Sequence, residues 1–497
     1  MKPLLAATLA LTLVAPAFPQ ATVNELQKLF PPGGAFLDSF GRDVAVLGDT
    51  AVVGAHGDDG KGSVAVLKRV AGSWTPAGKL SVAGGNPGDS FGWRVELLED
   101  VLYVAATGTD GGATNSGSVY RFDRVGDSFV PAGQLQSPDP GDFGAFGFDM
   151  DAAADLLVVG APDQAEVQVL AGAVYVFRKV GASLVLEQKL TAPVPSLASE
   201  FGFAVATDGQ RIVVGSVGED AVANDAGAAF VYAWNGSSWQ LEDSLFAADG
   251  GDSDYFGAAL DIDGDQLVVG AYNHDLPTVG AGAVYVYGLQ GGQWSADAKL
   301  GTLTGFNNEA FGWSVELDGP RLMIGATGHF SGAGGVFQYH HDGNQWVQVH
   351  RWLAADPFAG GGLKPGLGFC LALDGETLFA GAPFAGGAVS NSGAAFVFEA
   401  TDLALDALPD DVVGGQVLEL RTHGGLAGAP MGLALTGVSG LPFFDVLYLG
   451  SFDPAGQVSF LPVVPPALVG LELDFLAGGF WNPAELGFSN TVTVTVL

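Results

Sequence analysis

The stretch from Phe256 to Leu300 reads FGAALDIDGDQLVVGAYNHDLPTVGAGAVYVYGLQGGQWSADAKL, and related stretches occur throughout the chain. Seven copies can be aligned, and their starts lie 51, 55, 55, 55, 55 and 56 residues apart. The copies begin at Phe40, Phe91, Phe146, Phe201, Phe256, Phe311 and Leu367. A fixed period of this size indicates a repeat architecture, in which every copy forms one supersecondary unit.

The start of each copy has the pattern of a β-strand followed by a tight turn. In the fourth copy the large side chains of Phe201, Phe203 and Val205 alternate with small residues. A period of two predicts that these three side chains share one face of a strand. Asp-Gly pairs such as Asp263-Gly264 follow at the corresponding place, and they predict two-residue hairpins.

The rest of each copy predicts three more strands. In the fifth copy we expect Leu267–Val269 as the second strand and Ala283–Tyr287 as the third, with the turn Gly291-Gly292 leading into the fourth. Four antiparallel strands repeated without a helical pattern between them are typical of a β-propeller. The glycine after each initial Phe fits this fold, because inner strands approach one another closely where a Cβ atom is absent.

The two ends of the repeat region predict how the ring closes. The seventh copy stops after Phe396–Phe398, so it lacks a fourth strand. The segment Val23–Leu29 precedes the first copy and matches the fourth-strand segment Leu186–Leu190. We therefore predict a seven-bladed propeller of four-stranded blades, closed by the N-terminal strand so that no blade edge stays open.

The repeat also resembles a known family. Copies open with Phe-Gly and continue to Gly-Ala-Pro, which is complete at Gly160–Pro162 and Gly381–Pro383. This combination resembles the FG-GAP repeat, which builds the seven-bladed propeller of integrin α-chains and of many secreted bacterial proteins. An acidic residue two places before Phe is similar to the bacterial version and occurs as Asp38, Asp89, Asp254 and Glu309. The resemblance covers about residues 23–400 and implies the fold and an extracellular location, without naming a ligand.

The chain divides by composition into four parts. Residues 1–21 carry Lys2, an apolar run and the small-residue site Ala15-Pro16-Ala17, as in a secretory signal peptide. The alternative for this stretch is a buried N-terminal strand. The propeller takes residues 22–400 and an acidic linker takes 401–411. Residues 412–497 predict a small β-sandwich, because short strands follow one another closely. We expect these strands at Phe443–Leu449, Gln457–Leu461, Val469–Leu476 and Thr491–Leu497.

Charge and cysteine content restrict the partners. The chain has 54 acidic and 19 basic residues among 497, which gives a net charge of −35. This balance argues against nucleic acid or an anionic membrane as a partner. Its one cysteine, Cys370, permits no internal disulfide, and we expect a buried, inert thiol there. Apart from the signal, no run is long and apolar enough to span a membrane. We expect the protein to be a monomer.

Acidic residues gather in the loops between the second and third strands. These loops are expected on one rim of the propeller, where they would form a candidate ligand-binding surface. The candidate residues are Asp58, Asp59, Asp110, Asp220 and Asp275. Two other interpretations stay open, namely Asx turns in which each side chain caps its own loop, and cation binding.

The turn Asp261-Ile262-Asp263-Gly264-Asp265 is a candidate calcium site. In integrin-type propellers the loop between the first two strands carries Asp-x-Asp-x-Asp-Gly and binds calcium, which takes six to eight oxygen ligands. Here the spacing leaves only a tight turn, with Asp261, Asp263 and Asp265 as the possible ligands. The alternative is that these residues serve hairpin formation alone.

A third group of charges lies on the inner strands. Asp43, Arg94, Glu96, Asp149 and Asp151 alternate with large apolar residues. They are therefore expected to face either the axial channel or the neighbouring blade. The mixture of acids and one base predicts structural salt bridges rather than catalysis.

Two functions fit these observations. The sequence contains no Gly-x-Ser-x-Gly, no His-Glu-x-x-His, no phosphate-binding glycine loop and no Cys-His metal spacing. The first hypothesis is a secreted or cell-surface, non-catalytic binding or adhesion protein, which holds an extracellular protein or polysaccharide on a propeller rim. The alternative is an extracellular enzyme that acts on polysaccharides through the acidic rim residues.

Overall fold

A computed structural model of the chain describes residues 25–400 except 32, 166–168, 182, 276–277, 303–306, 354–363 and 387–390, together with six C-terminal strands. The chain divides into two compact units, Thr22–Asp402 and a unit that groups Met1–Ala21 with Leu403–Leu497. The predicted signal peptide and the predicted linker both lie outside the described residues.

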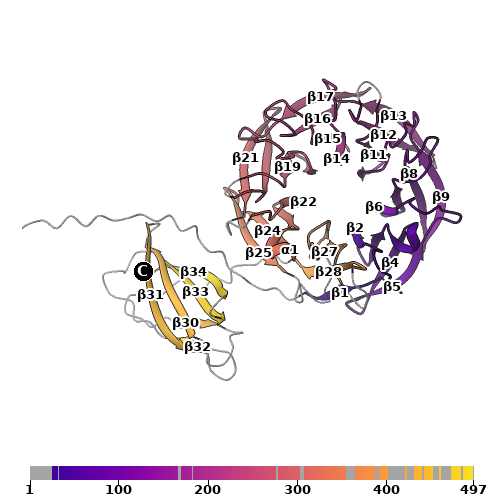
Figure 1. Ribbon diagram of the computed structural model, residues 1–497. Coiled ribbons are helices and arrows are strands. Elements are labelled where there is room, and N and C mark those ends of the chain that lie inside the picture. Colours follow the sequence, from indigo (N-terminus) through magenta and orange to yellow (C-terminus); the bar gives the residue numbers. More distant parts are fainter. Residues whose placement is uncertain are drawn as a thin grey trace, which may run out of the picture. The chain divides into compact units, whose positions relative to one another are not determined.

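Unit Thr22–Asp402 is a closed ring of seven antiparallel sheets with four strands each (Figure 1). In each sheet, or blade, the first strand of the repeat lies nearest the axis and the fourth forms the outer wall. The predicted seven-bladed propeller is confirmed.

The first four blades each correspond to one copy of the repeat. Blade 1 comprises β2 (Phe40–Leu47), β3 (Thr50–Ala55), β4 (Ser63–Val70) and β5 (Ser73–Leu80). Blade 2 comprises β6 (Phe91–Leu97), β7 (Val101–Ala106), β8 (Ser118–Val125) and β9 (Ser128–Gln136). Blade 3 comprises β10 (Met150–Ala153), β11 (Leu156–Ala161), β12 (Ala173–Val180) and β13 (Ser183–Leu190). Blade 4 comprises β14 (Phe201–Thr207), β15 (Arg211–Ser216), β16 (Ala228–Trp234) and β17 (Trp239–Leu245).

The remaining blades complete the ring. Blade 5 comprises β18 (Ala259–Asp263), β19 (Gln266–Ala271), β20 (Ala283–Gln290) and β21 (Gln293–Gly301). Blade 6 comprises β22 (Phe311–Asp318), β23 (Arg321–Ala326), β24 (Gly335–His341) and β25 (Trp346–Trp352). Blade 7 comprises β26 (Leu371–Asp374), β27 (Thr377–Ala382), β28 (Ala394–Glu399) and β1 (Gln27–Leu29). Two short helical segments, η1 (Asp58–Gly60) and α1 (His329–Gly332), lie in loops.

Strand β1 closes the ring as the outer strand of blade 7. It runs antiparallel to β28, with Gln27 opposite Val397 and Leu29 opposite Ala395. The seventh copy of the repeat therefore takes its fourth strand from the other end of the propeller. This pairing confirms the predicted closure and covers the edge that β28 would otherwise expose.

The predicted hairpins between the first and second strands form, and in blade 5 the loop lies one residue later than the Asp-Gly pair suggests. In blade 5, Asp263 still belongs to β18 and pairs with Gln266, so the loop is Gly264-Asp265. Gly264 has a φ of +57°. A loop of this type requires a left-handed conformation, which glycine adopts without a steric cost.

The glycine after the initial Phe interrupts the first strand, and the predicted alternation is therefore wrong at Phe203. Gly202 has a φ of +94°, and the register of β14 against β15 shifts between Phe201 and Val205. Phe201 and Val205 are buried in one apolar cluster, whereas Phe203 is only half-buried and lies beside Phe148. A left-handed residue turns the next side chain away from the face that simple alternation predicts.

Glycine is needed at this place because neighbouring blades approach one another there. A Cβ atom on Gly257 of blade 5 would lie 2.3 Å from the carbonyl oxygen of Ala228 in blade 4. Directly beside it, Phe256 forms a parallel bridge with Gly227, and equivalent bridges join all seven blade pairs. The close approach is thus between adjacent blades, which refines the expectation of crowding at the axis.

The core consists of apolar layers between adjacent blades. The Phe that opens each of the first six copies is at most 1% exposed. Phe256, for example, packs edge-on against Tyr285, with ring centroids 5.2 Å apart. Because each layer is shared by two blades, each blade depends on its neighbours for the burial of its core.

The C-terminal unit is also all-β in its described parts. Its strands are β29 (Leu420–Thr422), β30 (Pro430–Val438), β31 (Leu441–Ser451), β32 (Val458–Phe460), β33 (Glu472–Asn482) and β34 (Glu485–Thr495). Four of them form a sheet in the order β31-β30-β33-β34, and β29 pairs with β32. The four predicted strands overlap β31 to β34, while the packing of the two sheets into a sandwich stays a prediction. No helix within the described residues has the length and apolar character needed to cross a membrane.

Candidate functional site

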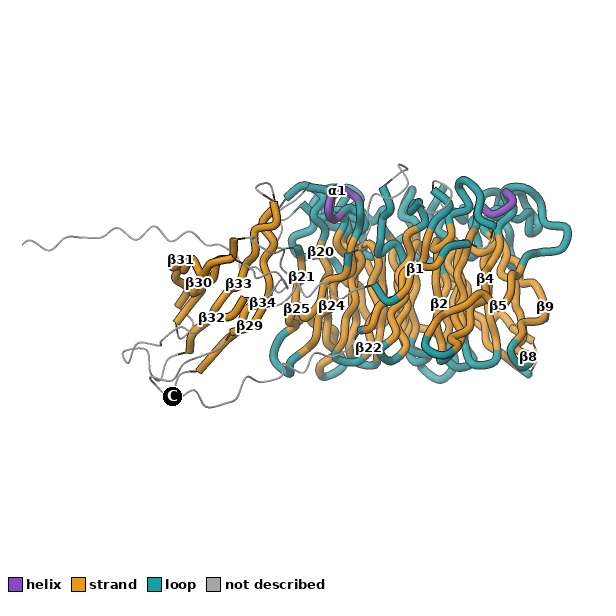
Figure 2. Tube along the Cα trace, turned by 90° about the horizontal axis from the view of Figure 1, so that it is seen from below, coloured by secondary structure: helices purple, strands orange, loops and turns teal. Residues whose placement is uncertain are grey.

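The propeller has two faces of different character (Figure 2). The hairpin face carries the tight turns between strands one and two and between strands three and four. The loop face carries the longer connections, namely those between strands two and three and those that lead to the next blade. Both η1 and α1 belong to these connections. Since binding residues concentrate on loops held by a rigid scaffold, the loop face is the candidate functional surface.

The structure places all five predicted rim acids on the loop face, but on four different blades. Three of them cap their own loops. A side-chain oxygen of each accepts a hydrogen bond from the backbone N–H five residues later, at 2.8–2.9 Å, in the pairs Asp110–Asn115, Asp220–Asp225 and Asp275–Gly280. These contacts are those of the loop-capping interpretation, in which the carboxylates stabilise turns.

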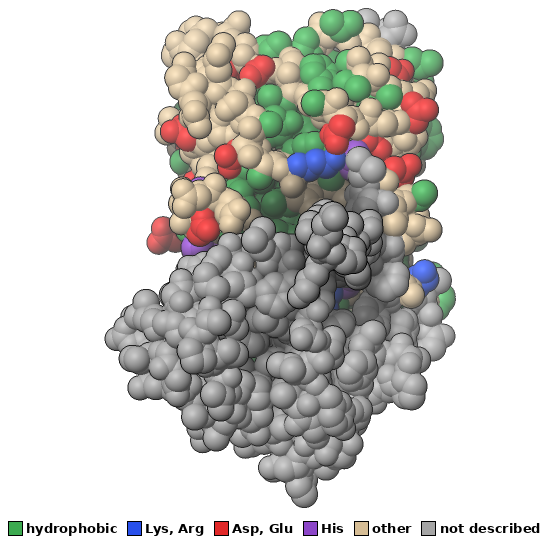
Figure 3. Space-filling model, turned by 90° about the vertical axis from the view of Figure 1, so that its left-hand side faces the viewer, with side chains coloured by type: hydrophobic (Ala, Val, Ile, Leu, Met, Phe, Trp, Pro, Cys, Tyr) green, Lys and Arg blue, Asp and Glu red, His purple; other side chains and the backbone are tan. Residues whose placement is uncertain are grey.

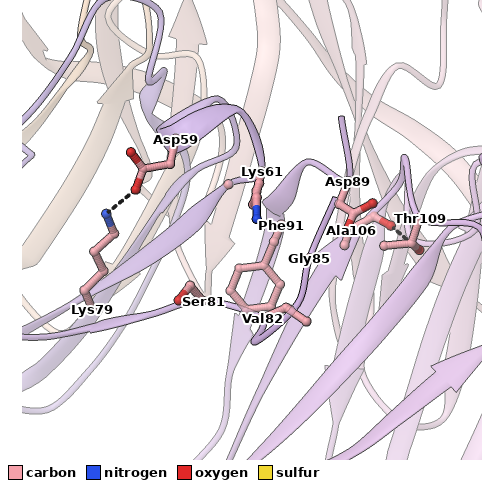
Figure 4. Close-up of a pocket in the computed structure, with 11 residues that line it drawn as sticks. Asp59, Lys61, Lys79, Ser81, Val82, Gly85, Asp89, Phe91, Ala106 and Thr109 are labelled. Carbon is pink, nitrogen blue, oxygen red and sulfur yellow. Dashed lines mark hydrogen bonds and ion pairs between the residues drawn. The ribbon is translucent and has the colours of Figure 1, made fainter. Parts of the chain in front are cut away.

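Asp59 borders a pocket of about 380 Å³ between blades 1 and 2 (Figure 4), and Asp58 precedes it in the same loop. The ammonium group of Lys79 lies 2.5 Å from Asp58 and 3.7 Å from the largely exposed Asp59. Ser63 also donates a hydrogen bond to Asp58. The pocket is lined by Asp59, Lys61, Gly62, Lys79, Ser81, Val82, Gly85, Asp89, Phe91, Ala106 and Thr109. Its polar lining carries both signs of charge, so Asp58 and Asp59 are partly neutralised there.

The calcium candidates lie on the hairpin face and are used by the adjacent blade. Asp261 accepts hydrogen bonds from the backbone N–H groups of Ile262 at 2.7 Å and Leu317 at 2.6 Å. Asp263 accepts one from Gly319 at 2.9 Å. Within the described residues, no group of three or more His, Cys, Asp or Glu side chains is arranged to hold a metal ion. Asp261 and Asp263 therefore join blade 5 to blade 6, a role that neither the calcium interpretation nor the hairpin interpretation included.

The same contact recurs around the inner strands and explains their charges. Asp43 accepts a hydrogen bond from the N–H of Val95 at 2.7 Å, and Asp149 accepts one from Val205 at 2.8 Å, in each case from the next blade. Arg94 lies between these acids, 3.2 Å from Asp43 and 2.9 Å from Asp149. It thereby links blades 1, 2 and 3 through charge-assisted contacts. The expected structural salt bridges are present.

Further acids on the inner strands lack such a base and keep part of their protons. Burial and the neighbouring Asp261 raise the pKa of Asp151 to about 7. Burial also raises the pKa of Asp261 to about 6 and holds that of Glu96 and Glu316 well above its usual range, with neighbouring carboxylates adding to both. Carboxyl groups in such surroundings are partly neutral at pH 7.

The acids that precede Phe-Gly support buried histidines in blades 5 and 6. Asp254 lies 2.6 Å from Nδ1 of His274, and Lys299 lies 2.7 Å from Nε2 of the same ring. Glu309 contacts His329 in the same way at 2.9 Å. Both rings are at most 2% exposed. They hold loops in place and are closed to a substrate, although the repeat brings acid, histidine and base together.

Sequence analysis missed a ring of aromatic side chains at the axial mouth of the loop face. They follow Phe-Gly directly and form, with one arginine, the aromatic collar of Arg42, Trp93, Phe148, Phe203, Trp313 and Phe369. Neighbouring rings have centroids 5.1–5.8 Å apart in the pairs Trp93–Phe148, Phe148–Phe203 and Trp313–Phe369. The guanidinium of Arg42 lies 4.0 Å from the Trp93 centroid and 4.9 Å from that of Phe369, as in cation–π contacts. The signal was present in the sequence as an aromatic residue after Phe-Gly in four copies and after Leu-Gly in the seventh.

A second pocket of about 300 Å³ adjoins this collar and is called the blade 2–3 groove. It is lined by Gly88, Ser90, Trp93, Thr107, Gly108, Asn115, Phe143, Ala145, Phe148 and Asp163. It differs from the first pocket because aromatic rings and uncharged polar groups dominate its lining.

The geometry defines a seven-bladed β-propeller with tight hairpins on one face and longer loops on the other. The family comparison agrees, since the FG-GAP repeat model matches residues 23–66, 74–122, 184–232 and 239–287. The chain carries FG-GAP repeats, and the resemblance seen in the sequence is confirmed. Among solved structures, it is similar to Chaetomium thermophilum Sqt1, with 13% identity, a TM-score of 0.47 and coverage of 76% of this chain and 98% of that one. No curated protein matches the sequence.

Proposed function

We propose that this chain is a secreted or cell-surface protein, not an enzyme, which binds an extracellular protein or polysaccharide on the loop face of its propeller. The observation that carries the proposal is the exposure of large apolar side chains in the loops of this face. They are Phe36, Leu37, Phe143, Leu197 and Phe384, with exposed fractions of 37–66%. On the hairpin face the exposed large apolar side chains of the described turns are the valines Val70, Val125 and Val180.

Exposed apolar groups of this size favour association, because covering them removes apolar surface from water. The strands beneath the loops are hydrogen-bonded within four-stranded sheets, so little order should be lost when a ligand binds. Acidic side chains are scattered over the described surface seen in Figure 3, with few basic ones. The net charge of −35 therefore favours neutral or basic partners over anionic ones.

The repeat family and the burial of the acid–histidine contacts support a non-catalytic role. FG-GAP repeats are typical of extracellular proteins, which agrees with the proposed location. General acid–base catalysis requires a titratable group within hydrogen-bonding reach of a substrate. His274 and His329 are enclosed, and Asp110, Asp220 and Asp275 are engaged in their own loops.

The proposal is tested with the full chain immobilised on a sensor and exposed to extracellular polysaccharides and surface-protein fractions. Leu197→Ser and Phe384→Ser on the loop face should weaken the response, whereas Val70→Ser and Val180→Ser on the hairpin face should leave it unchanged. Equal loss in both pairs, or binding that neither pair affects, would contradict a loop-face site. Turnover of a polysaccharide that Asp220→Ala or Asp275→Ala abolishes would favour the enzymatic alternative.

A further inference from the structure

The blade 2–3 groove combines an aromatic wall with polar groups that point to one kind of ligand. Its wall includes Trp93 and Phe148, whose rings are tilted against each other with centroids 5.8 Å apart. The guanidinium of Arg42 lies 4.0 Å from the centroid of Trp93 and holds the indole by a cation–π contact. The aromatic wall is therefore held in place before any ligand arrives.

Phe143 forms the outer edge of the groove and is unusually open for a phenylalanine. Its side chain is 61% exposed, and its backbone has a φ of +61°. The backbone N–H of Phe143 is tied to the carbonyl of Thr114 across the groove at 2.7 Å. The same positive φ and the same type of backbone hydrogen bond recur at the equivalent residues Leu37, Ser253 and Asn308. They belong to the repeat and hold the loop that presents the Phe143 side chain.

Two polar side chains in the groove are not engaged with the described protein. The carboxyl of Asp163 and the amide of Asn115 make no side-chain hydrogen bond or ion pair within the described residues, although both line the pocket. Burial alone raises the pKa of Asp163 above its usual range. A partly desolvated carboxyl and a free amide gain most from a ligand with hydroxyl groups, because these donate and accept at close spacing.

We propose that the blade 2–3 groove binds a neutral sugar ring of a polysaccharide, with the C–H face of the ring on Phe143, Trp93 and Phe148 and its hydroxyls on Asp163 and Asn115. The volume of about 300 Å³ suits one or two sugar rings. An anionic sugar is disfavoured, because no lysine or arginine lines the groove and Asp163 does. A cationic side chain is disfavoured at Trp93, because the guanidinium of Arg42, 4.0 Å from the centroid of the indole, would repel it.

This inference rests on the proposed function and adds a ligand class and a position to it. Its test uses the full chain and a panel of neutral hexasaccharides of glucose, mannose, galactose and N-acetylglucosamine, titrated by calorimetry. Phe143→Ala and Asp163→Ala should each weaken binding about 10-fold, which corresponds to about 1.4 kcal/mol. Val125→Ala is the control, since Val125 is 60% exposed, much like Phe143, but lies at a turn of the hairpin face.

The thermal midpoint of each variant is measured as a control for misfolding. If the midpoint is unchanged, a lost binding response reflects the groove. Binding of a hexasaccharide that Val125→Ala leaves unchanged and both groove substitutions weaken supports the proposal. It is overturned if no member of the panel binds, if binding survives both groove substitutions, or if an arginine-rich peptide is the ligand that depends on Asp163. Binding lost through Leu197→Ser but not through Phe143→Ala would overturn the groove while the loop-face function stands.

Discussion

Replacing Gly257 by alanine should destabilise the propeller far more than the same change at Gly236. The two glycines have nearly equal φ values, +94° and +97°. A Cβ atom at Gly236 would meet nothing within 4 Å, whereas at Gly257 it would lie 2.3 Å from the carbonyl oxygen of Ala228. The pair therefore separates the cost of the backbone conformation from the cost of close approach between blades.

The magnitudes follow from these contacts. Both substitutions carry the conformational cost of a side chain at positive φ, about 1–2 kcal/mol. At Gly257 the backbone must also move, which disturbs the hydrogen bonds from Phe256 N to Ala226 O at 2.9 Å and from Gly257 N to Gly270 O at 3.0 Å. Each buried bond that is lost costs about 1–3 kcal/mol. We expect a loss of about 3–5 kcal/mol at Gly257 and about 1–2 kcal/mol at Gly236.

Equilibrium unfolding in urea, followed by tryptophan fluorescence, measures this difference. Eight of the nine tryptophans lie between Trp74 and Trp352, so the signal reports mainly on the propeller. The slope of the transition should be the same in both variants, because the surface exposed on unfolding does not change. If Gly257→Ala costs no more than Gly236→Ala, the close approach of the blades does not explain the glycine in Phe-Gly.

Three further predictions follow from the charged groups. Asp151 and Asp261 have pKa values raised in the folded state to about 7 and about 6, so their contribution to stability is present below pH 4 and is lost as the pH rises through 6–7. Asp151→Asn should flatten the dependence of the thermal midpoint on pH between 4 and 8, and an unchanged slope would contradict this. Arg94→Met should cost about 3–5 kcal/mol, because it leaves two buried carboxylates without their base. Lys68→Met, which breaks a pair with the 92% exposed Asp127, should cost less than about 1 kcal/mol in the same urea titration. Calcium and a chelator should leave the thermal midpoint of the full chain unchanged, because Asp261 and Asp263 already accept backbone N–H groups; a clear rise with calcium would restore the metal interpretation.

The fold could be predicted because it depends on what the repeats share. The regular return of Phe-Gly sets the number of blades, and the incomplete last copy indicates that Val23–Leu29 completes it. Local irregularities within a strand do not change the predicted number of blades or their closure, because each blade needs only four strands in the right order. The orientation of single side chains depends on one dihedral angle, and the left-handed Gly202 was enough to turn Phe203 out of the predicted face.

The candidate site could be predicted only in part, because it depends on how the copies differ. The rim acids were found through their common spacing, but their spacing does not show that Asp110 and Asp220 cap their own loops. The blade 2–3 groove combines Phe143, Asn115 and Asp163 from loops of two blades. No repeat period links these three residues, so only their positions in the structure show that they line one groove.

The closure of the ring has a mechanical consequence. Strands β1 and β28 run antiparallel, and the first residue of β1, Gln27, lies opposite Val397, close to where the chain leaves blade 7. Tension applied between the two ends of the propeller would therefore break the pairing of β1 with β28 one residue pair at a time, from Gln27 towards Leu29. If a ligand pulls on the loop face while the chain is held beyond Glu399, the force does not pass through the pairing of β1 with β28. Under a pulling force, the propeller would therefore stay closed longest when no load reaches β1.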